Sequence, residues 1–444
     1  MELPLFIIYL IVWFWLTLKR KKQEGFFSVF FIFGLGGFAY FVVIPFELYI
    51  RGVDYFFAHA WMRLGSYERN LVLFISIISL FGFYFGLTLS CYRLLPKKYF
   101  METKECGLNK NRYRWPIRIL ICIIIVSGSI LIIFYRDLIF AQSDYVVAYG
   151  ITYESPLYSF VKMHFLIALG LTAGLIKHRG WRWKGKTISL AIVILIVLMG
   201  ILTSDKGPLL LALLTCASFI EFNKISFIKF VTISSFGSVC VIIIVLFFNL
   251  YRTQIPIVEV FHKMPWTEIS FVKLDPGGPM VTLCSVIEDN VPLRYGKTYI
   301  DGIGVIIPKA IWPDRPLSLS EEFAQDFITD YSEGKGLGYS PLAESLLNFH
   351  IPGAFIHFFI FGFFFGVFLE YLKKRIFVNL NSLLVPFIYI VGYQIIIMSF
   401  RSPLVGPLKL LILIIVPYCV VIILLRLCGK IASPTQRFDD IHGT

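Results

Sequence analysis

Residues Asn70–Tyr92 read NLVLFISIISLFGFYFGLTLSCY and contain no charged side chain. A helix needs about 20 predominantly apolar residues to cross the hydrocarbon core of a bilayer, and this stretch is long enough to do so. Similar apolar blocks recur along the 444 residues, which are 57% hydrophobic and 16% charged, with a mean hydropathy of +0.77. Soluble domains carry about 25% charged residues. The sequence therefore predicts an all-α polytopic membrane protein.

The charge and the cysteines indicate neither a nucleic-acid-binding protein nor one that is held together by metal ions or disulfides. A formal net charge of +13 would indicate nucleic-acid binding in a soluble protein. In a membrane protein, basic residues collect in cytoplasmic loops, so we expect the lipid bilayer and no nucleic acid as a partner. Most of the 8 cysteines lie inside apolar blocks without CxxC or Cys/His spacing. The sequence thus indicates no metal site, cofactor or disulfide.

The distribution of basic residues predicts the topology. The cluster KRKKQ at 19–23 follows the first apolar block rather than preceding it, unlike the basic start of a cleavable signal peptide. Basic clusters then fall on every second loop, which places the N-terminus outside and the C-terminus in the cytoplasm. We predict eleven spans, at 3–18, 26–50, 70–92, 117–135, 156–176, 187–203, 208–222, 230–250, 353–372, 377–399 and 407–427.

These spans divide the chain into four parts: a bundle of about eight spans at 1–250, an external loop at 251–352, three spans within 353–427 and a cytoplasmic tail at 428–444. The loop is acidic, with 8 Lys or Arg against 13 Asp or Glu. Loops of this length are usually functional. It contains a single cysteine, Cys284, so we expect short helices, prolines and docking onto the bundle to order it.

A first helix in this loop is predicted at about 319–331. Ser318 precedes Glu321 by three residues, the spacing of a capping box in which each side chain bonds a free backbone N–H at the helix start. Helical spacing puts apolar and acidic residues on opposite faces. The apolar face holds Phe323, Phe327, Ile328 and Tyr331, and the acidic face holds Glu322, Asp326 and Asp330.

A second helix is predicted to begin at Pro341, with Ser340 as its N-cap. Glu344 falls in the first turn, where the helix dipole favours an anion, and Asn348 lies four residues on, on the same face. Pro352–Gly353 should break this helix before the ninth span. Glu344 and Asn348 are therefore expected at the outer membrane surface, facing one way.

Basic residues at outer span ends and in the loop are the candidates for binding an anion: Lys206, Arg252, Arg294, Arg315 and Arg401. The planar guanidinium of arginine binds phosphate oxygens through two parallel hydrogen bonds. Several cations together can stabilise a pyrophosphate leaving group without metal. Each could instead snorkel to lipid headgroups. We favour function for Lys206 and Arg401, because external junctions are normally poor in basic residues; Arg136 and Arg51 stay closer to snorkelling.

An acceptor hydroxyl would need a base, and Glu344, Asp326 and His350 are available. Glu344 is equally explained as a good first-turn residue. Lys162 and His164 lie in or near the fifth span, where an ionisable group is a functional hypothesis. His357 can bond a neighbouring helix, and the GxxxG of Gly362 and Gly366 predicts close helix packing rather than chemistry. The sequence holds no DxD, P-loop or GxGxxG motif.

Two segments of the chain resemble a known family. DGIGVIIPKAIWPDRPLSLSEEFAQDF (301–327) and GLGYSPLAESLLNFHIPGAFIHFFIFGFFFGVFLEYL (336–372) look like the bacterial O-antigen and oligosaccharide-repeat-unit polymerases of the Wzy type. The matching positions are Ile307, Pro308, Trp312, Pro313, Asp314, Arg315, Pro316, Ser340, Pro341, Glu344, Asn348, Phe349 and Gly353. TSDKGPLL (203–210) and FRSPLVGPLK (400–409) resemble two junctions of these polymerases. His350 and Ile351 stand where a glycine often follows Asn-Phe, which puts the helix break in question.

The resemblance implies a metal-independent membrane glycosyltransferase with a GT-C-like fold, in the bacterial inner membrane with its active site facing the periplasm. It would polymerise oligosaccharide repeats carried on polyprenyl pyrophosphate. Lys206, Arg252, Arg294, Arg315 and Arg401, with Asn348, would bind pyrophosphate or glycan; Arg315 and Arg401 would also act in catalysis, with Glu344 or a nearby acid serving the acceptor. A chain-length regulator and a flippase of the same pathway are the expected protein partners.

Three alternatives remain open at the level of the sequence. An O-antigen ligase shares the topology and the donor, and the Trp-Pro-Asp-Arg-Pro segment favours the polymerase over it. A flippase for lipid-linked oligosaccharides needs a charged path through the bundle, whereas the predicted spans are nearly free of charge in their middles. A structural scaffold for polysaccharide assembly is the third.

Overall fold

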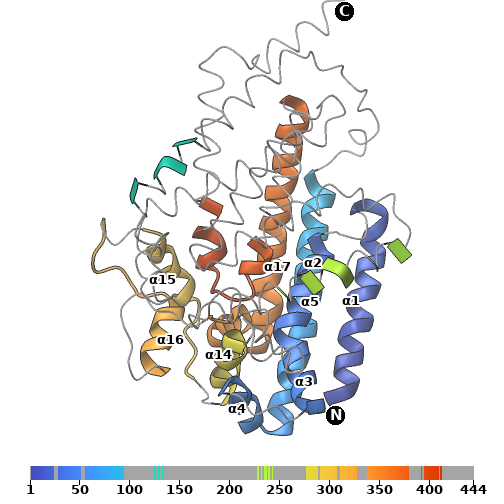
Figure 1. Ribbon diagram of the computed structural model, residues 1–444, viewed down its shortest axis with the longest axis vertical. Helices are drawn as coiled ribbons and strands as arrows, with labels where there is room; N and C mark the ends of the chain where they lie inside the picture. The colour runs from blue at the N-terminus through green and yellow to red at the C-terminus, as the bar shows by residue number, and fades with distance from the viewer. Residues whose placement is uncertain are drawn as a thin grey trace, which may run out of the picture.

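The regular elements that the structure describes are all helices (Figure 1). The computed structural model describes residues 2–24, 29–51, 56–94, 277–288, 291–307, 311–327 and 338–379, with short pieces between 125 and 134, between 228 and 243, and between 392 and 412.

Four of the described segments are long and apolar enough to cross a membrane. They are α1 (Glu2–Glu24), the continuous run of α2 (Val29–Gly37), η1 (Phe38–Val42) and α3 (Val43–Arg51), α5 (Ser66–Leu94), and α17 (Pro341–Asn379). They coincide with the predicted spans at 3–18, 26–50, 70–92 and 353–372, although α17 begins earlier than predicted. The other seven predicted spans lie wholly or largely outside the described residues. The described fold is helical and compatible with a membrane protein.

Aromatic contacts fix the directions of the first two segments. Phe6, near the start of α1, packs edge-on against Phe46 of α3. Further along α1, Trp13 stacks on Phe31 of α2. The contact order reverses between the two segments, so they run antiparallel.

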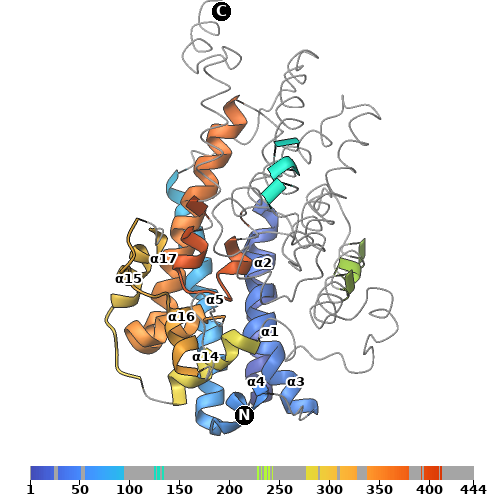
Figure 2. The same ribbon diagram turned by 60° about the vertical axis from the view of Figure 1, so that its left-hand side comes forward.

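Helices α5 and α17 pack side by side and parallel, as both views show (Figures 1 and 2). Gly82 and Gly86 of α5 lie against the backbone of Phe355 and Phe359, and Gly362 of α17 lies against Phe83. A Cβ on Gly362 would stand 2.6 Å from the carbonyl oxygen of Phe83. Small residues allow such close backbone approach between helices in membranes. The predicted packing role of Gly362 is confirmed.

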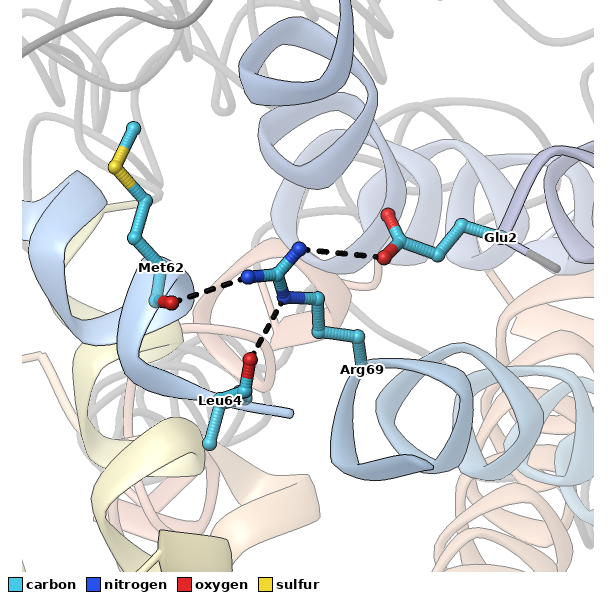
Figure 3. A network of polar contacts seen from close by, with 4 residues as sticks. All are labelled: Glu2, Met62, Leu64 and Arg69. Carbon is cyan, nitrogen blue, oxygen red and sulfur yellow. Dashed lines mark hydrogen bonds and ion pairs between the residues drawn. The ribbon is translucent and has the colours of Figure 1, made fainter. Parts of the chain in front are cut away.

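Arg69, in the first turn of α5, ties three helices together at one end of the bundle (Figure 3). Its guanidinium donates to the backbone oxygens of Leu64 and Met62, both at 3.0 Å. These carbonyls lie at the C-terminal end of α4 (Phe56–Arg63), where a helix leaves its last carbonyls unpaired. The same guanidinium forms an ion pair with Glu2 of α1 at 3.5 Å.

The predicted external loop contributes three described helices: α14 (Gly277–Glu288), α15 (Lys297–Ile306) and α16 (Leu319–Phe327). The sequence predicted only α16. Its capping box is confirmed: Glu321 accepts from the backbone N–H and the hydroxyl of Ser318, at 3.0 and 2.9 Å, and the Glu321 N–H donates back to Ser318 Oγ at 3.3 Å. Residues 328–331, the predicted end of this helix, lie outside the described residues.

Helix α14 is part of the core rather than an appendage. Its apolar side chains Met280, Val281 and Leu283 are buried, and the helix packs against α4, α5 and α17 and against η1 in the middle of the second long segment. Buried Thr282 accepts the backbone N–H of Ser340 at 2.9 Å. Part of the long loop therefore fills space between the long helices.

The predicted start and break of the last loop helix are both present in α17. The Ser340 hydroxyl accepts the N–H of Ala343 at 3.4 Å, as an N-cap does. The break lies at Phe349 (φ −140°, ψ 19°) and His350 (φ 56°, ψ −154°), just before Pro352 rather than at it. Proline is tolerated in a first turn, so Pro352 sits at the start of the second part of α17.

Candidate functional site

The carboxylate of Glu344 joins three segments that are far apart in the sequence. Its Oε2 accepts the backbone N–H of Leu404 at 2.8 Å, and its Oε1 accepts the hydroxyl of Thr298 in α15 at 3.2 Å. The residue is only 1% exposed. A buried carboxylate is tolerated when hydrogen bonds satisfy it. Glu344 therefore faces the interior of the protein, and its place at the outer membrane surface stays a prediction.

Asn348 faces the same way as Glu344, as predicted, but it too is buried. Its side-chain N–H groups donate to Thr298 Oγ1 at 2.6 Å and to the Glu344 backbone oxygen at 2.8 Å, and its Oδ1 accepts the N–H of Gly296 at 2.8 Å. Gly296 has φ 88°, a left-handed conformation that favours glycine. Asn348 therefore fixes the tight turn from which α15 begins. An expected ligand-binding amide is thus fully engaged within the protein.

Arg401 lies on a turn that is held from both sides. Its backbone oxygen accepts the N–H of Tyr339 at 3.1 Å. The ring of Phe400, which precedes Arg401 in the chain, packs among Phe33, Tyr40 and Phe41 of the second long segment. The side chain of Arg401 is half-buried. Because its backbone is anchored to the core, the point from which the Arg401 side chain extends is fixed.

Arg315 is bound to the end of α15. Its guanidinium donates to the backbone oxygen of Val305, one of the carbonyls that a helix leaves free in its last turn. Its Nε is buried and has no hydrogen-bond partner in the described part of the chain. Arg315 makes no ion pair with Asp314, although the sequence placed them side by side. Lys409 is exposed but lies within electrostatic reach of both Arg315 and Glu321.

Arg294 holds α16 against the head of α17. Its guanidinium binds Glu322 through two nitrogens, at 2.9 and 2.6 Å, and its backbone N–H donates to Leu347 at 2.9 Å. The bond to Glu322 raises the pKa of Arg294 above its ordinary value. Glu322, which the sequence placed on the acidic face of this helix, is therefore paired with a cation. Arg294 acts as a clamp between elements of the loop.

Tyr299 and Tyr339 both lie within electrostatic reach of Glu344. The Tyr299 hydroxyl shares a 2.9 Å hydrogen bond with Nδ1 of His357, which fulfils the expectation that His357 bonds a neighbouring helix. Burial raises the pKa of Tyr299 and of Tyr339, and the nearby Glu344 carboxylate raises both further. Both phenols are therefore neutral hydrogen-bonding groups at physiological pH.

The remaining candidates are placed as follows. Asp326 and His350 are exposed, the first on α16 and the second at the break in α17. Lys206 and Arg252 lie outside the described residues, as do Arg136, Lys162 and His164. Among the described residues, no group of three or more His, Cys, Asp or Glu side chains is arranged to hold a metal ion.

Sequence reasoning missed Thr298 and the Leu404 backbone N–H, which complete the Glu344 network. Thr298 stands in a helix that was not predicted, and a backbone N–H has no sequence signal. The whole site brings together both segments that carry the family resemblance and the junction at 400–409. Comparison with protein families, with curated proteins and with solved structures finds no match for this chain.

Proposed function

We propose that the protein is a polymerase of oligosaccharide repeat units carried on polyprenyl pyrophosphate, with a GT-C-like bundle of about eleven spans in the bacterial inner membrane and its site on the periplasmic side. One observation carries the proposal: the Glu344 network binds α15, the head of α17 and the Arg401 turn into a single unit. These are the segments whose motifs resemble the polymerases. Their convergence gives the motifs a common location.

In the proposed reaction a sugar hydroxyl of the acceptor repeat attacks the anomeric carbon of the donor glycan. A new C–O bond forms, the bond from the anomeric carbon to the pyrophosphate oxygen breaks, and polyprenyl pyrophosphate leaves with the bonding electrons. The acceptor hydroxyl passes its proton to a base. Cations placed at the departing oxygen stabilise the charge that develops there.

We assign binding of the pyrophosphate anion to Arg401 and Arg315, with Lys409 as a further cation. Lys206 and Arg252, outside the described residues, are assigned to the same anion. Arg401 is half-buried and anchored. Partial burial strengthens a charge interaction with a ligand, because the effective dielectric is lower than in water. Arg294 is already neutralised by Glu322, so we assign it to holding the site together.

Glu344 positions the site rather than receiving the acceptor proton. Its burial leaves no path to an acceptor, and both of its oxygens already accept hydrogen bonds. The exposed groups Asp326 and His350 are the ones that an acceptor could reach. This division of roles separates the residues that shape the site from those that contact substrate.

The alternatives differ in what they need. A flippase moves its substrate through the bundle and uses charged groups along the way. In the four long segments that the structure describes, the buried charged residues Arg20, Glu47 and Glu344 lie near the ends of the segments, which favours an enzyme over a flippase. An O-antigen ligase would transfer the glycan to a lipid A-core acceptor, and a scaffold would transfer nothing.

The test in cells is the chain length of the surface polysaccharide in a strain that carries the protein as its only polymerase. Arg401→Ala and Arg252→Ala should each remove long chains, leaving single repeats, at unchanged protein level. Arg63→Ala is the matched control, because this exposed arginine pairs with Glu288 at 3.2 Å and surface pairs contribute little. Undiminished long chains in both test variants would contradict the assignment as a polymerase.

A further inference from the structure

Helix α15 carries an apolar stripe that nothing in the described part of the chain covers. Ile300 and Ile303 are 70% and 62% exposed, and Ile307 continues the same face. Lys297 stands at one end of this stripe, and the side chains of Ile311 and Trp312 are also exposed. The opposite face, with Thr298 and Val305, is buried. Solvated helices do not normally present such a stripe to water.

The depth of α15 is set by its contact with α17. Tyr299 of α15 bonds His357 at 2.9 Å and stacks on Phe349. His357 stands seven residues beyond His350, which corresponds to a rise of about 10 Å along a helix. It lies well inside the segment Pro341–Phe368, which is apolar and long enough to span a membrane. Helix α15 therefore lies alongside this segment rather than beyond its end, as both views show (Figures 1 and 2).

The exposed face of α17 begins beside the residue that contacts α15. Ile356, next to His357, is exposed, and Ile360 and Phe364 follow it at four-residue intervals. This spacing places the three side chains in one row along the helix. A row of exposed apolar residues on a membrane-spanning segment faces lipid. Tyr299, which precedes Ile300, bonds His357, so α15 meets α17 at the level where this row begins.

We propose that α15 and the side chains of Ile311 and Trp312 are immersed in the lipid bilayer beside α17, with Ile300, Ile303 and Ile307 in contact with acyl chains. The occupant of this surface is bilayer lipid, since α15 contacts α17 at His357, inside the apolar segment Pro341–Phe368 and beside its exposed row. Amphipathic helices lie in the membrane boundary in this way. Trp312 suits the headgroup level, and the Lys297 ammonium can reach the headgroups along its flexible stem. The inference does not depend on the proposed polymerase activity.

The test places a benzophenone amino acid at Ile300 or Ile303 of the full-length protein in phospholipid nanodiscs. Irradiation should add one phospholipid mass to either variant, detected by intact mass spectrometry. Ile360, on the exposed row of α17, is the positive control. Gln325, exposed on α16, is the aqueous control and should gain no lipid. Adducts at Ile360 but not at Ile300 or Ile303 would overturn the proposal.

A second measurement uses the unaltered protein, in case a substituted variant aggregates. A membrane-partitioning diazirine should label the peptide that contains residues 297–307, whereas a water-soluble diazirine should label it weakly. The peptide that contains Gln325 should show the reverse. Labelling of 297–307 mainly from water would contradict immersion, and protection from both reagents would indicate a protein contact instead of lipid.

Discussion

Glu344 accepts a hydrogen bond from the backbone N–H of Leu404 at 2.8 Å, across 60 positions of sequence. The same carboxylate accepts the hydroxyl of Thr298. One buried side chain thus sets the Arg401 turn relative to α15. Breaking this relationship should displace Arg401 even though its own side chain is intact.

Glu344→Gln should keep polymerisation measurable, because the amide oxygen can still accept the Leu404 N–H. Glu344→Ala should abolish polymerisation. It leaves two buried donors, the Leu404 N–H and the Thr298 hydroxyl, unpaired, at a cost of about 1–3 kcal/mol each. If Glu344 were the general base, Gln would remove about 10²- to 10⁴-fold of the rate. The measurement is the initial rate of chain extension, with thermal unfolding of both variants in detergent. A rate for Gln as low as that for Ala would contradict the positioning role.

Asn348→Ala should destabilise the fold strongly. It removes the acceptor for Gly296 N–H and the two donations to Thr298 and Glu344, and each buried group left unpaired costs about 1–3 kcal/mol. Ser345→Ala is the matched control on the same buried helix, because its hydroxyl donates to the backbone oxygen of Leu342 one turn back. Thermal unfolding should show a large drop for Asn348→Ala and a small one for Ser345→Ala. Equal drops would argue against the network.

His350→Gly should stabilise the protein. His350 adopts φ 56° and ψ −154°, a conformation that glycine enters readily and other residues enter at a cost of about 1–3 kcal/mol. His350→Ala keeps a Cβ and should give no gain, so it separates backbone strain from loss of the imidazole. A higher unfolding temperature for glycine alone is the expected result. Destabilisation by glycine would mean that the imidazole holds the break in place.

Gly362→Ala should weaken the contact between α5 and α17, because the new methyl group meets the backbone oxygen of Phe83 at 2.6 Å. Overpacking of this kind costs about 1–3 kcal/mol. Gly128→Ala is the control, since a Cβ there meets nothing within 4 Å. Gly362→Ala should unfold at a lower temperature than Gly128→Ala. A tolerated Gly362→Ala would show that the two helices can separate freely.

The parts of the fold that the sequence predicted rest on local patterns. The capping box of Ser318 and Glu321 joins residues three apart, and the long apolar helices follow from the composition of single segments. The break before Pro352 follows from the missing N–H of proline. His350 shows the limit of such local reasoning: the absence of glycine put the break in question, yet the structure places the break there with a strained backbone.

The parts that the sequence did not predict rest on contacts between distant segments. Helix α14 begins at Gly277-Gly278-Pro279, residues that are typical of a turn, and its burial comes from α4, α5 and α17. Arg294 and Glu322 are 28 positions apart, so nothing local marks them as a pair. Glu344 fits a surface first-turn residue as well as a buried one until its partner Leu404 is known.

The most direct test of the central claim is the purified protein in nanodiscs, supplied only with a polyprenyl-pyrophosphate-linked repeat. The account predicts a ladder of lipid-linked products that grow by whole repeats, with polyprenyl pyrophosphate released at each step. Arg401→Ala should reduce the rate by at least about 10²-fold, and Arg63→Ala should leave it unchanged. Protein that is folded and monodisperse, yet forms no product longer than one repeat, would contradict the account.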